Sequence, residues 1–170
     1  MRTMTARAIH SAMAFLFALT AHAQPAATAL GKAASDKGFR SCARQLDFMA
    51  AFVYAKDRFE FLNTWNVNRP DERLFNSITA KAYPDATTVA TFTSVPTVTG
   101  RCDSVLTHTT YVPGTSCSQV RESAFAGWTH FADLGRMPVL EDQSDKGGAS
   151  ALLVPAGDGC MVIKQFILYR

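Results

Sequence analysis

Four cysteines constrain this chain more than any other feature of its sequence. They are Cys42, Cys102, Cys117 and Cys160, at intervals of 60, 15 and 43 residues. A zinc site of the common kinds needs close cysteine pairs with histidines at matching spacing, whereas His108 and His130 each stand alone. An even number of cysteines in an exported chain indicates disulfides. The sequence therefore predicts two disulfides, and we expect neither a metal nor a cofactor.

The segment between the two middle cysteines indicates how the four are paired. Val105–Val112 is rich in β-branched and aromatic residues and is followed by a Pro-Gly turn, which is typical of a strand. About ten extended residues span roughly 33 Å, whereas the Cα atoms of a disulfide lie about 4.4–6.8 Å apart. Cys102 and Cys117 are therefore too far apart to bond, and we predict the pairs Cys42–Cys102 and Cys117–Cys160.

Residues 1–23 are typical of a secretory signal peptide. Arg2 and Arg7 precede the apolar run 12–19, and the sequence Ala-His-Ala matches the small-x-small pattern before a cleavage site. The apolar run is shorter than the roughly 20 residues that a membrane-spanning helix needs. We therefore expect cleavage between Ala23 and Gln24, and a soluble mature protein that is periplasmic or extracellular.

Removal of the signal peptide changes the charge of the protein. The full chain has 17 basic and 14 acidic residues, and Arg2 and Arg7 leave with the signal, so the mature chain carries a net charge of +1. No cluster of lysine and arginine remains that would follow a phosphate backbone. We therefore expect no nucleic-acid partner.

The mature chain of 147 residues is long enough for one domain with one hydrophobic core. Residues 24–34 are small and weakly patterned, and we expect them to form a loose leader. The domain is then expected to cover residues 35–170. Its fold class is predicted from the order of the helices and strands within these residues.

The first part of the domain is expected to be helical. Ser35-Asp36 is a candidate N-cap, and the apolar residues behind it recur at spacings of three and four: Phe39, Cys42, Leu46, Met49 and Val53. Pro70, with two acidic residues after it, predicts a second helix that ends before Pro84. Between these helices, 58–67 favours a strand, although its apolar spacing also fits a helix.

The second part of the domain is typical of a sheet. Thr87–Val95 and Cys102–Val112 are strand-like, and Cys117–Trp128 fits either a third strand or a short helix. Ala151–Pro155 and Cys160–Tyr169 flank a Gly-containing turn and predict a β-hairpin.

Apolar residues on both sides of Met161–Leu168 predict a central strand that is covered on both faces. Helices that come first along the chain and antiparallel strands that follow are typical of the α+β class. The sequence thus predicts a two-layer α+β domain, in which N-terminal amphipathic helices pack on a mainly antiparallel sheet stapled by disulfides.

The segment Trp128–Asp133 is the best candidate site, because it combines two aromatic residues, a titratable ring and a carboxylate: Trp128, Phe131, His130 and Asp133. His130 can act as the base of a small hydrolase if a serine from elsewhere, such as Ser104, Ser116 or Ser118, supplies the nucleophile. No motif of a known catalytic class accompanies these residues. We expect instead that the segment forms the rim of a partner surface or part of the core, and that His108 makes a cross-strand hydrogen bond.

Taken together, these features predict an exported, non-enzymatic protein that binds another exported macromolecule. An inhibitor, an immunity-like protein, or an assembly factor for an envelope or secretion structure fits this description, because exposed aromatic residues anchor such interfaces. A carrier of a small apolar ligand or lipid is the first alternative, since a helix on a curved sheet can enclose an apolar cavity. A small hydrolase that uses His130 is the second alternative.

Overall fold

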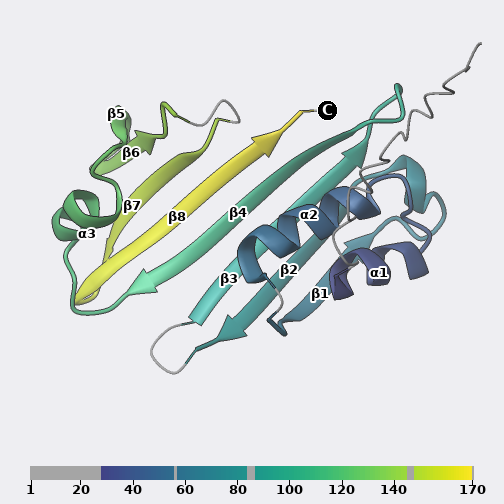
Figure 1. Cartoon of the computed structure of the whole chain (residues 1–170), viewed down its shortest axis with the longest axis horizontal. Helices are drawn as coiled ribbons and strands as arrows, with labels where there is room; N and C mark the ends of the chain where they lie inside the picture. Colours follow the sequence, from purple (N-terminus) through teal and green to yellow (C-terminus); the bar gives the residue numbers. More distant parts are fainter. Residues whose placement is uncertain (1–27, 56, 84–86, 145–147, 170) are drawn as a thin grey trace, which may run out of the picture.

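The fold is built on an eight-stranded antiparallel sheet with three α-helices on one of its faces (Figure 1). The computed structural model describes residues 28–55, 57–83, 87–144 and 148–169. The elements are α1 (Ala29–Asp36), α2 (Ala43–Tyr54), β1 (Glu60–Trp65), the 3-10 turn η1 (Pro70–Glu72), β2 (Phe75–Ala82), β3 (Thr87–Pro96), β4 (Cys102–Val112), α3 (Cys117–Ala124), β5 (Thr129–Leu134), β6 (Met137–Glu141), β7 (Ser150–Ala156) and β8 (Gly159–Leu168).

The sheet consists of two four-stranded meanders joined along their inner strands. Its strand order is β1-β2-β3-β4-β8-β7-β6-β5, and every neighbouring pair is antiparallel. β4 and β8 form the junction, with Ser104 opposite Leu168 at one end and Val112 opposite Cys160 at the other. Since strands adjacent in sequence pair within each meander, the β4–β8 pairing brings the two meanders together.

The first cluster of buried residues lies between α1, α2 and strands β2–β4. From the sheet, Phe75, Phe92 and Leu106 meet Leu46 and Met49 of α2. The ring of Phe39, between the two helices, stacks on the ring of Phe75 with centroids 5.0 Å apart. This first cluster is the larger of two hydrophobic cores in the described residues, so the prediction of a single core is wrong.

The second cluster lies between α3 and strands β6–β8. Its buried residues are Val120, Phe125, Leu140, Ala151, Leu153, Cys160 and Val162. Val112 packs against this cluster, whereas Leu106 belongs to the first one. These two β4 residues are six positions apart and therefore point to the same side of the strand. Both clusters consequently lie on one face of the sheet, which we call the helix face.

Both predicted disulfides are confirmed. Cys42 is bonded to Cys102, with Cα atoms 5.7 Å apart, and Cys117 is bonded to Cys160, with Cα atoms 4.9 Å apart. Each bond joins the start of a helix to the first or second residue of a strand. The α+β architecture is confirmed as well, with two N-terminal helices packed on an antiparallel sheet.

The helix predicted to begin at Ser35 is confirmed over Ala43–Tyr54, but its start is wrong, because the chain forms two helices here. Residues 29–34, expected in the loose leader, lie in α1, so that prediction is wrong for them. The physical reason is Asp47 of α2. Its Oδ1 accepts hydrogen bonds from the backbone N–H of Thr28 at 2.7 Å and of Gly31 at 3.1 Å. This carboxylate binds the unsatisfied N–H groups at the start of α1 and so holds that short helix against α2.

The helix predicted from Pro70 is also wrong. Pro70–Glu72 forms a single 3-10 turn, and the chain continues as strand β2. Asp71 does not serve a helix start but accepts hydrogen bonds from the backbone N–H of Arg40 and Ser41 at 2.8 and 2.7 Å. Pairing of β2 with strands on both sides satisfies its backbone groups and buries Phe75, which outweighs the local helix signals.

The other element predictions have mixed outcomes. Strand β1 confirms the strand interpretation of 58–67, and β7 with β8 confirms the predicted hairpin. Of the two alternatives for 117–128, the short helix is correct, since α3 covers Cys117–Ala124. The signal peptide and residues 24–27 lie outside the described residues. None of the described helices is long and apolar enough to cross a membrane.

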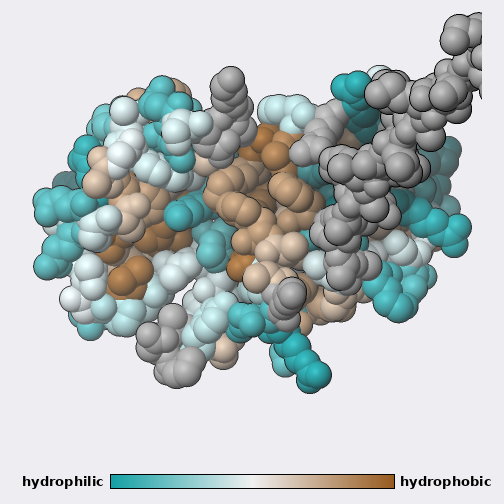
Figure 2. Space-filling model, in the orientation of Figure 1, coloured by the Kyte–Doolittle hydropathy of each residue, from teal (hydrophilic) through white to brown (hydrophobic). Residues whose placement is uncertain are grey.

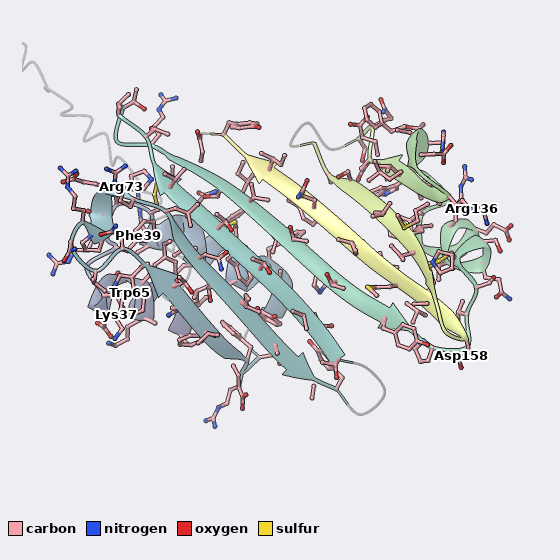
Figure 3. The ribbon with its side chains drawn as sticks, turned by 180° about the vertical axis from the view of Figure 1, so that it is seen from behind. Lys37, Phe39, Trp65, Arg73, Arg136 and Asp158 are labelled. Carbon is pink, nitrogen blue, oxygen red and sulfur yellow. A yellow bond between two sulfur atoms is a disulfide. The ribbon has the colours of Figure 1, made fainter. Side chains whose placement is uncertain are left out.

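Strand β8 departs from its prediction in one respect. It is central in the sheet, between β4 and β7, but the described helices cover one side of it. Viewed from behind, the sheet lies in front of its helices, and no helix of the described residues lies on its other side (Figure 3). The prediction that β8 is covered on both sides is therefore wrong within the described part of the chain, and we call the uncovered side the open face.

Candidate functional site

The structure brings His130 and Asp133 together on β5, the last strand at one edge of the sheet. The Nε2 of His130 lies 3.0 Å from Oδ1 of Asp133, and both side chains are exposed. Phe131 lies between them in sequence, at an irregularity in the β5–β6 pairing, and is 67% exposed. An edge strand also presents unpaired backbone groups to any approaching chain. These three residues therefore form an exposed edge, as a partner surface requires.

Trp128 is separated from the other three residues of its segment. Its ring packs edge-on against Phe125, with centroids 4.9 Å apart, and it borders the second cluster. The Nζ of Lys164 lies 5.9 Å from the centroid of the same ring. The expected four-residue site is thus divided between the sheet edge and the helix face.

The three serines considered as nucleophiles are each engaged elsewhere. The hydroxyl of Ser104 is buried and bonded to that of Ser94. Ser116 caps α3 by accepting from the backbone N–H of Gln119, and its hydroxyl lies 3.0 Å from that of Ser118. A nucleophile must reach its base within about 3 Å to be activated. None of these hydroxyl contacts among the described residues involves His130.

A more unusual arrangement lies on the helix face between α2 and α3. His108 of β4 sits directly opposite Lys164 of β8, and both are half-buried. The Nε2 of His108 is buried and has no hydrogen-bond partner among the described residues, so the expected cross-strand bond is absent at this nitrogen. Burial lowers the pKa of His108, and the positive charge of Lys164 lowers it further. The imidazole is therefore held in its neutral form near pH 7.

These two residues line a pocket of about 210 Å³. Its other walls come from β4, β8 and α3: Thr110, Val112, Val162, Val120, Ala124 and Phe125. The ammonium of Lys164 lies 5.0 Å from the ring centroid of Phe125. The pocket thus combines apolar walls with one cation and one neutral imidazole.

Exposed aromatic residues flank the same region on the side of α2. Phe52 is 61% exposed, and its ring meets Phe166 of β8 edge-on, with centroids 5.1 Å apart. Figure 2 shows hydrophobic side chains gathered in the middle of this face and again towards α3, with hydrophilic side chains between them. Along β8, Lys164 lies between Val162 of the second cluster and Phe166, which packs against the first, so the polar pair lies between two apolar regions.

A second pocket, of about 520 Å³, lies beside the Cys42–Cys102 disulfide. Its lining includes Arg44, Arg101 and Tyr169, all of which are exposed. Because these charges are in contact with water, an anion gains little by binding them. The smaller pocket beside α3 has the more distinctive chemistry.

The open face of the sheet carries apolar and hydroxyl side chains instead of a charged surface. Along β3, β4 and β8 it presents Thr87, Val89, Thr91, Thr93, Val95, Asp103, Val105, Thr107, Thr109, Tyr111, Met161, Ile163, Gln165 and Ile167. Asp103 is the one charged residue in this set. The face continues onto β1 and β2, where Leu62 and Ile78 are 69% and 47% exposed.

Sequence reasoning missed the pairing of His108 with Lys164. One signal for it was available, since Lys164 interrupts a strand that is otherwise apolar on the side that faces the helices. The partner residues come from β4 and α3, which no local pattern connects to β8. No protein-family model, curated protein or solved structure gives a significant match to this chain.

Proposed function

We propose that this protein is an exported, non-enzymatic binding protein, and that another exported macromolecule docks on the open face of its sheet. The observation that carries the proposal is the composition of that face, which is apolar and rich in threonine but lacks a described covering layer. Extended apolar patches on soluble proteins mark interaction sites. The two disulfides are consistent with an oxidising, exported location.

Strand β8 supports the proposal most directly. Met161, Ile163 and Ile167 lie on the open face, whereas Cys160 and Val162 of the same strand are buried on the helix face. A strand that is apolar on both sides is typical of a sheet covered on both faces. A docked partner would provide the second layer.

The chemistry of the open face also indicates the class of partner. Asp103 is its one charged residue along β3, β4 and β8. These strands therefore present no lysine or arginine on this face to bind the phosphates of a nucleic acid. Valine, isoleucine and threonine have few rotamers and lose little entropy when they are covered. These properties suit a protein partner with a mixed apolar and hydrogen-bonding surface.

The exposed edge on β5 is the second part of this proposed surface. His130, Phe131 and Asp133 project at the end of the same sheet, and Phe131 is well placed to act as an aromatic anchor. Replacing Phe131 with alanine is expected to weaken the complex less than a charge at the centre of the open face. The edge would then be the rim of the interface and the open face its centre.

The test places two charges at the centre of the open face. Thr109 and Ile163 are direct cross-strand neighbours there, so the double variant Thr109→Lys/Ile163→Lys puts two like charges where apolar contact is proposed. We expect partner affinity to fall at least about 30-fold, the equivalent of roughly 2 kcal/mol. Val98→Lys, in the fully exposed β3–β4 turn, is the matched control and should bind as the wild type does.

The measurement is quantitative affinity capture from the native exported fraction, with light scattering of the purified protein alone. Capture of one stoichiometric partner by the wild type and Val98→Lys, but not by the double variant, supports the proposal. Equal capture by all three proteins contradicts docking on the open face. A homodimer that the double variant converts to monomer, or co-purification of lipids without a protein, contradicts a separate macromolecular partner.

A further inference from the structure

We infer that the pocket between α3 and the β4–β8 pair binds a small amphiphilic monoanion, a carboxylate attached to one ring or to a short alkyl chain. The pocket lies on the helix face, opposite the surface proposed for the macromolecular partner. The site is therefore independent of that docking surface. Four features of the pocket lead to this ligand.

The first feature is the size and apolar character of the pocket. Its volume is about 210 Å³, and five of its lining residues are apolar: Val112, Val120, Ala124, Phe125 and Val162. An apolar cavity of about 150 Å³ is large enough to hold benzene. The space beneath α3 therefore accepts a single ring or a short alkyl chain.

The second feature is the unbalanced charge of Lys164. Its side chain is half-buried, and no salt bridge to it is present in the part of the chain that the structure describes. The faces of Phe125 and Trp128, at 5.0 and 5.9 Å from Nζ, provide the attraction around this ammonium. A partly desolvated cation next to apolar walls favours an anion more strongly than a fully hydrated one does.

The third feature is the unpartnered nitrogen of His108. Buried polar atoms in proteins nearly always have a hydrogen-bond partner, yet the Nε2 of His108 has none among the described residues. A neutral imidazole carries one N–H donor, and Nε2 can be that donor. This nitrogen is closed to solvent, so the half-buried imidazole must turn for its N–H to reach the pocket. A carboxylate would then accept this hydrogen bond with one oxygen and contact the ammonium of Lys164 with the other.

The fourth feature is the number of donors, which selects a monoanion. His108 and Lys164 are direct cross-strand neighbours, so a second positive charge on His108 is disfavoured by the first. The pocket therefore offers one cation and one neutral donor. A phosphate dianion is usually held by more charge and by the fork of an arginine side chain, which this lining lacks.

The experiment measures binding of octanoate to the disulfide-bonded protein by isothermal titration calorimetry. Acetate and 1-octanol are the matched probes, because acetate has the charge without the chain and 1-octanol has the chain without the charge. We expect one octanoate per protein, at least tenfold weaker binding of 1-octanol, and no detectable binding of acetate. In NMR spectra, the ring signals of His108 should shift on addition of octanoate.

Two variants assign the binding to this pocket. Lys164→Met keeps a long unbranched side chain and removes the charge, so octanoate should bind at least tenfold more weakly and 1-octanol about as before. Lys37→Met is the matched control, because the Nζ of Lys37 also lies 5.0 Å from an aromatic centroid, that of Trp65, at the other end of the sheet (Figure 3). Ala124→Phe, at an exposed position of α3, fills the pocket and should abolish binding of both probes.

Several results would overturn the inference. These are equal affinity for octanoate and 1-octanol, equal weakening by Lys164→Met and Lys37→Met, or no octanoate binding by folded wild-type protein. Unchanged octanoate binding by Ala124→Phe would place the ligand elsewhere. The Thr109→Lys/Ile163→Lys variant should still bind octanoate, which separates this site from the docking surface.

Discussion

The two clusters on the helix face are built from similar parts but hold their helices in different ways. The first cluster contains thirteen buried residues and the second contains seven, counted over the described chain. In the first, α1 and α2 are tied to each other through Asp47 and packed over three strands. In the second, the eight-residue helix α3 is anchored by Val120 and by the disulfide at its first residue.

This comparison shows why two similar disulfides need not do the same work. Their loops close 60 and 43 residues, which in a chain-entropy estimate stabilise the fold by about 4 kcal/mol each. The two disulfides therefore restrict the unfolded chain to nearly the same extent. The difference lies in the native state, because α2 has many other contacts and α3 has few.

The largest expected effect is the loss of an aromatic ring from the first cluster. Phe92 is fully buried between the sheet and α2, so Phe92→Ala should lower the free energy of unfolding by about 3–5 kcal/mol. Phe125→Ala should cost less, about 2–3 kcal/mol, because Phe125 borders an open pocket that water can enter after truncation. Urea unfolding of both variants checks this, and an equal or larger loss for Phe125→Ala would contradict the comparison.

Removal of each disulfide should have the next largest effect. The double variants Cys42→Ala/Cys102→Ala and Cys117→Ala/Cys160→Ala should each lose about 2–4 kcal/mol of stability. Hydrogen exchange should separate them. The amides of α3 should exchange by local opening without Cys117–Cys160, whereas the amides of α2 should stay protected up to global unfolding without Cys42–Cys102. Protection of α3 that survives loss of its disulfide would show that side-chain packing suffices to hold it.

The smallest effect is a pH dependence at the boundary between the two clusters. Burial and the charge of Lys164 lower the pKa of His108 in the folded protein below its unfolded value of about 6.5. As the pH falls from 7, His108 is therefore protonated in the unfolded chain while it stays neutral in the native state. The free energy of unfolding decreases until the pH passes the native pKa.

The variant His108→Gln should remove this part of the acid destabilisation. The loss of unfolding free energy between pH 7 and pH 5 is then expected to be smaller in His108→Gln than in the wild type. His130→Gln, in the exposed pair with Asp133, is the control for loss of a histidine elsewhere. An unchanged pH dependence in His108→Gln would mean that the imidazole is not held neutral by its surroundings.

The sequence by itself determined those features that depend on short-range geometry. The length of the strand between Cys102 and Cys117 ruled out their bond and led to the correct disulfide pairs. The turn Ala156–Gly159 with apolar strands on both sides predicted the β7–β8 hairpin. Period and turn chemistry are properties of neighbouring residues, so they can be recognised without the rest of the fold.

Tertiary structure decided the elements whose partners are distant in sequence. Pro70 and Asp71 carry good helix signals, but the backbone of the next segment pairs with β1 and β3, and Asp71 binds the loop before α2. Asp47, far along the chain, stabilises a helix over residues that locally resemble a leader. In both cases hydrogen bonds from elsewhere in the molecule outweigh a local preference of a few tenths to about 1 kcal/mol.

The candidate sites depend on tertiary structure in the same way. Part of the exposed edge on β5 could be found from the sequence, because His130 and Asp133 are three residues apart. That Trp128 does not belong to this edge became visible only from the packing of its ring against Phe125. The pocket needs β4, β8 and α3 together, and the β4–β8 register alone places His108 opposite Lys164. The pairing of strands that are distant in sequence produces no repeating pattern of residues. The sites that depend on it are therefore visible only in the folded chain.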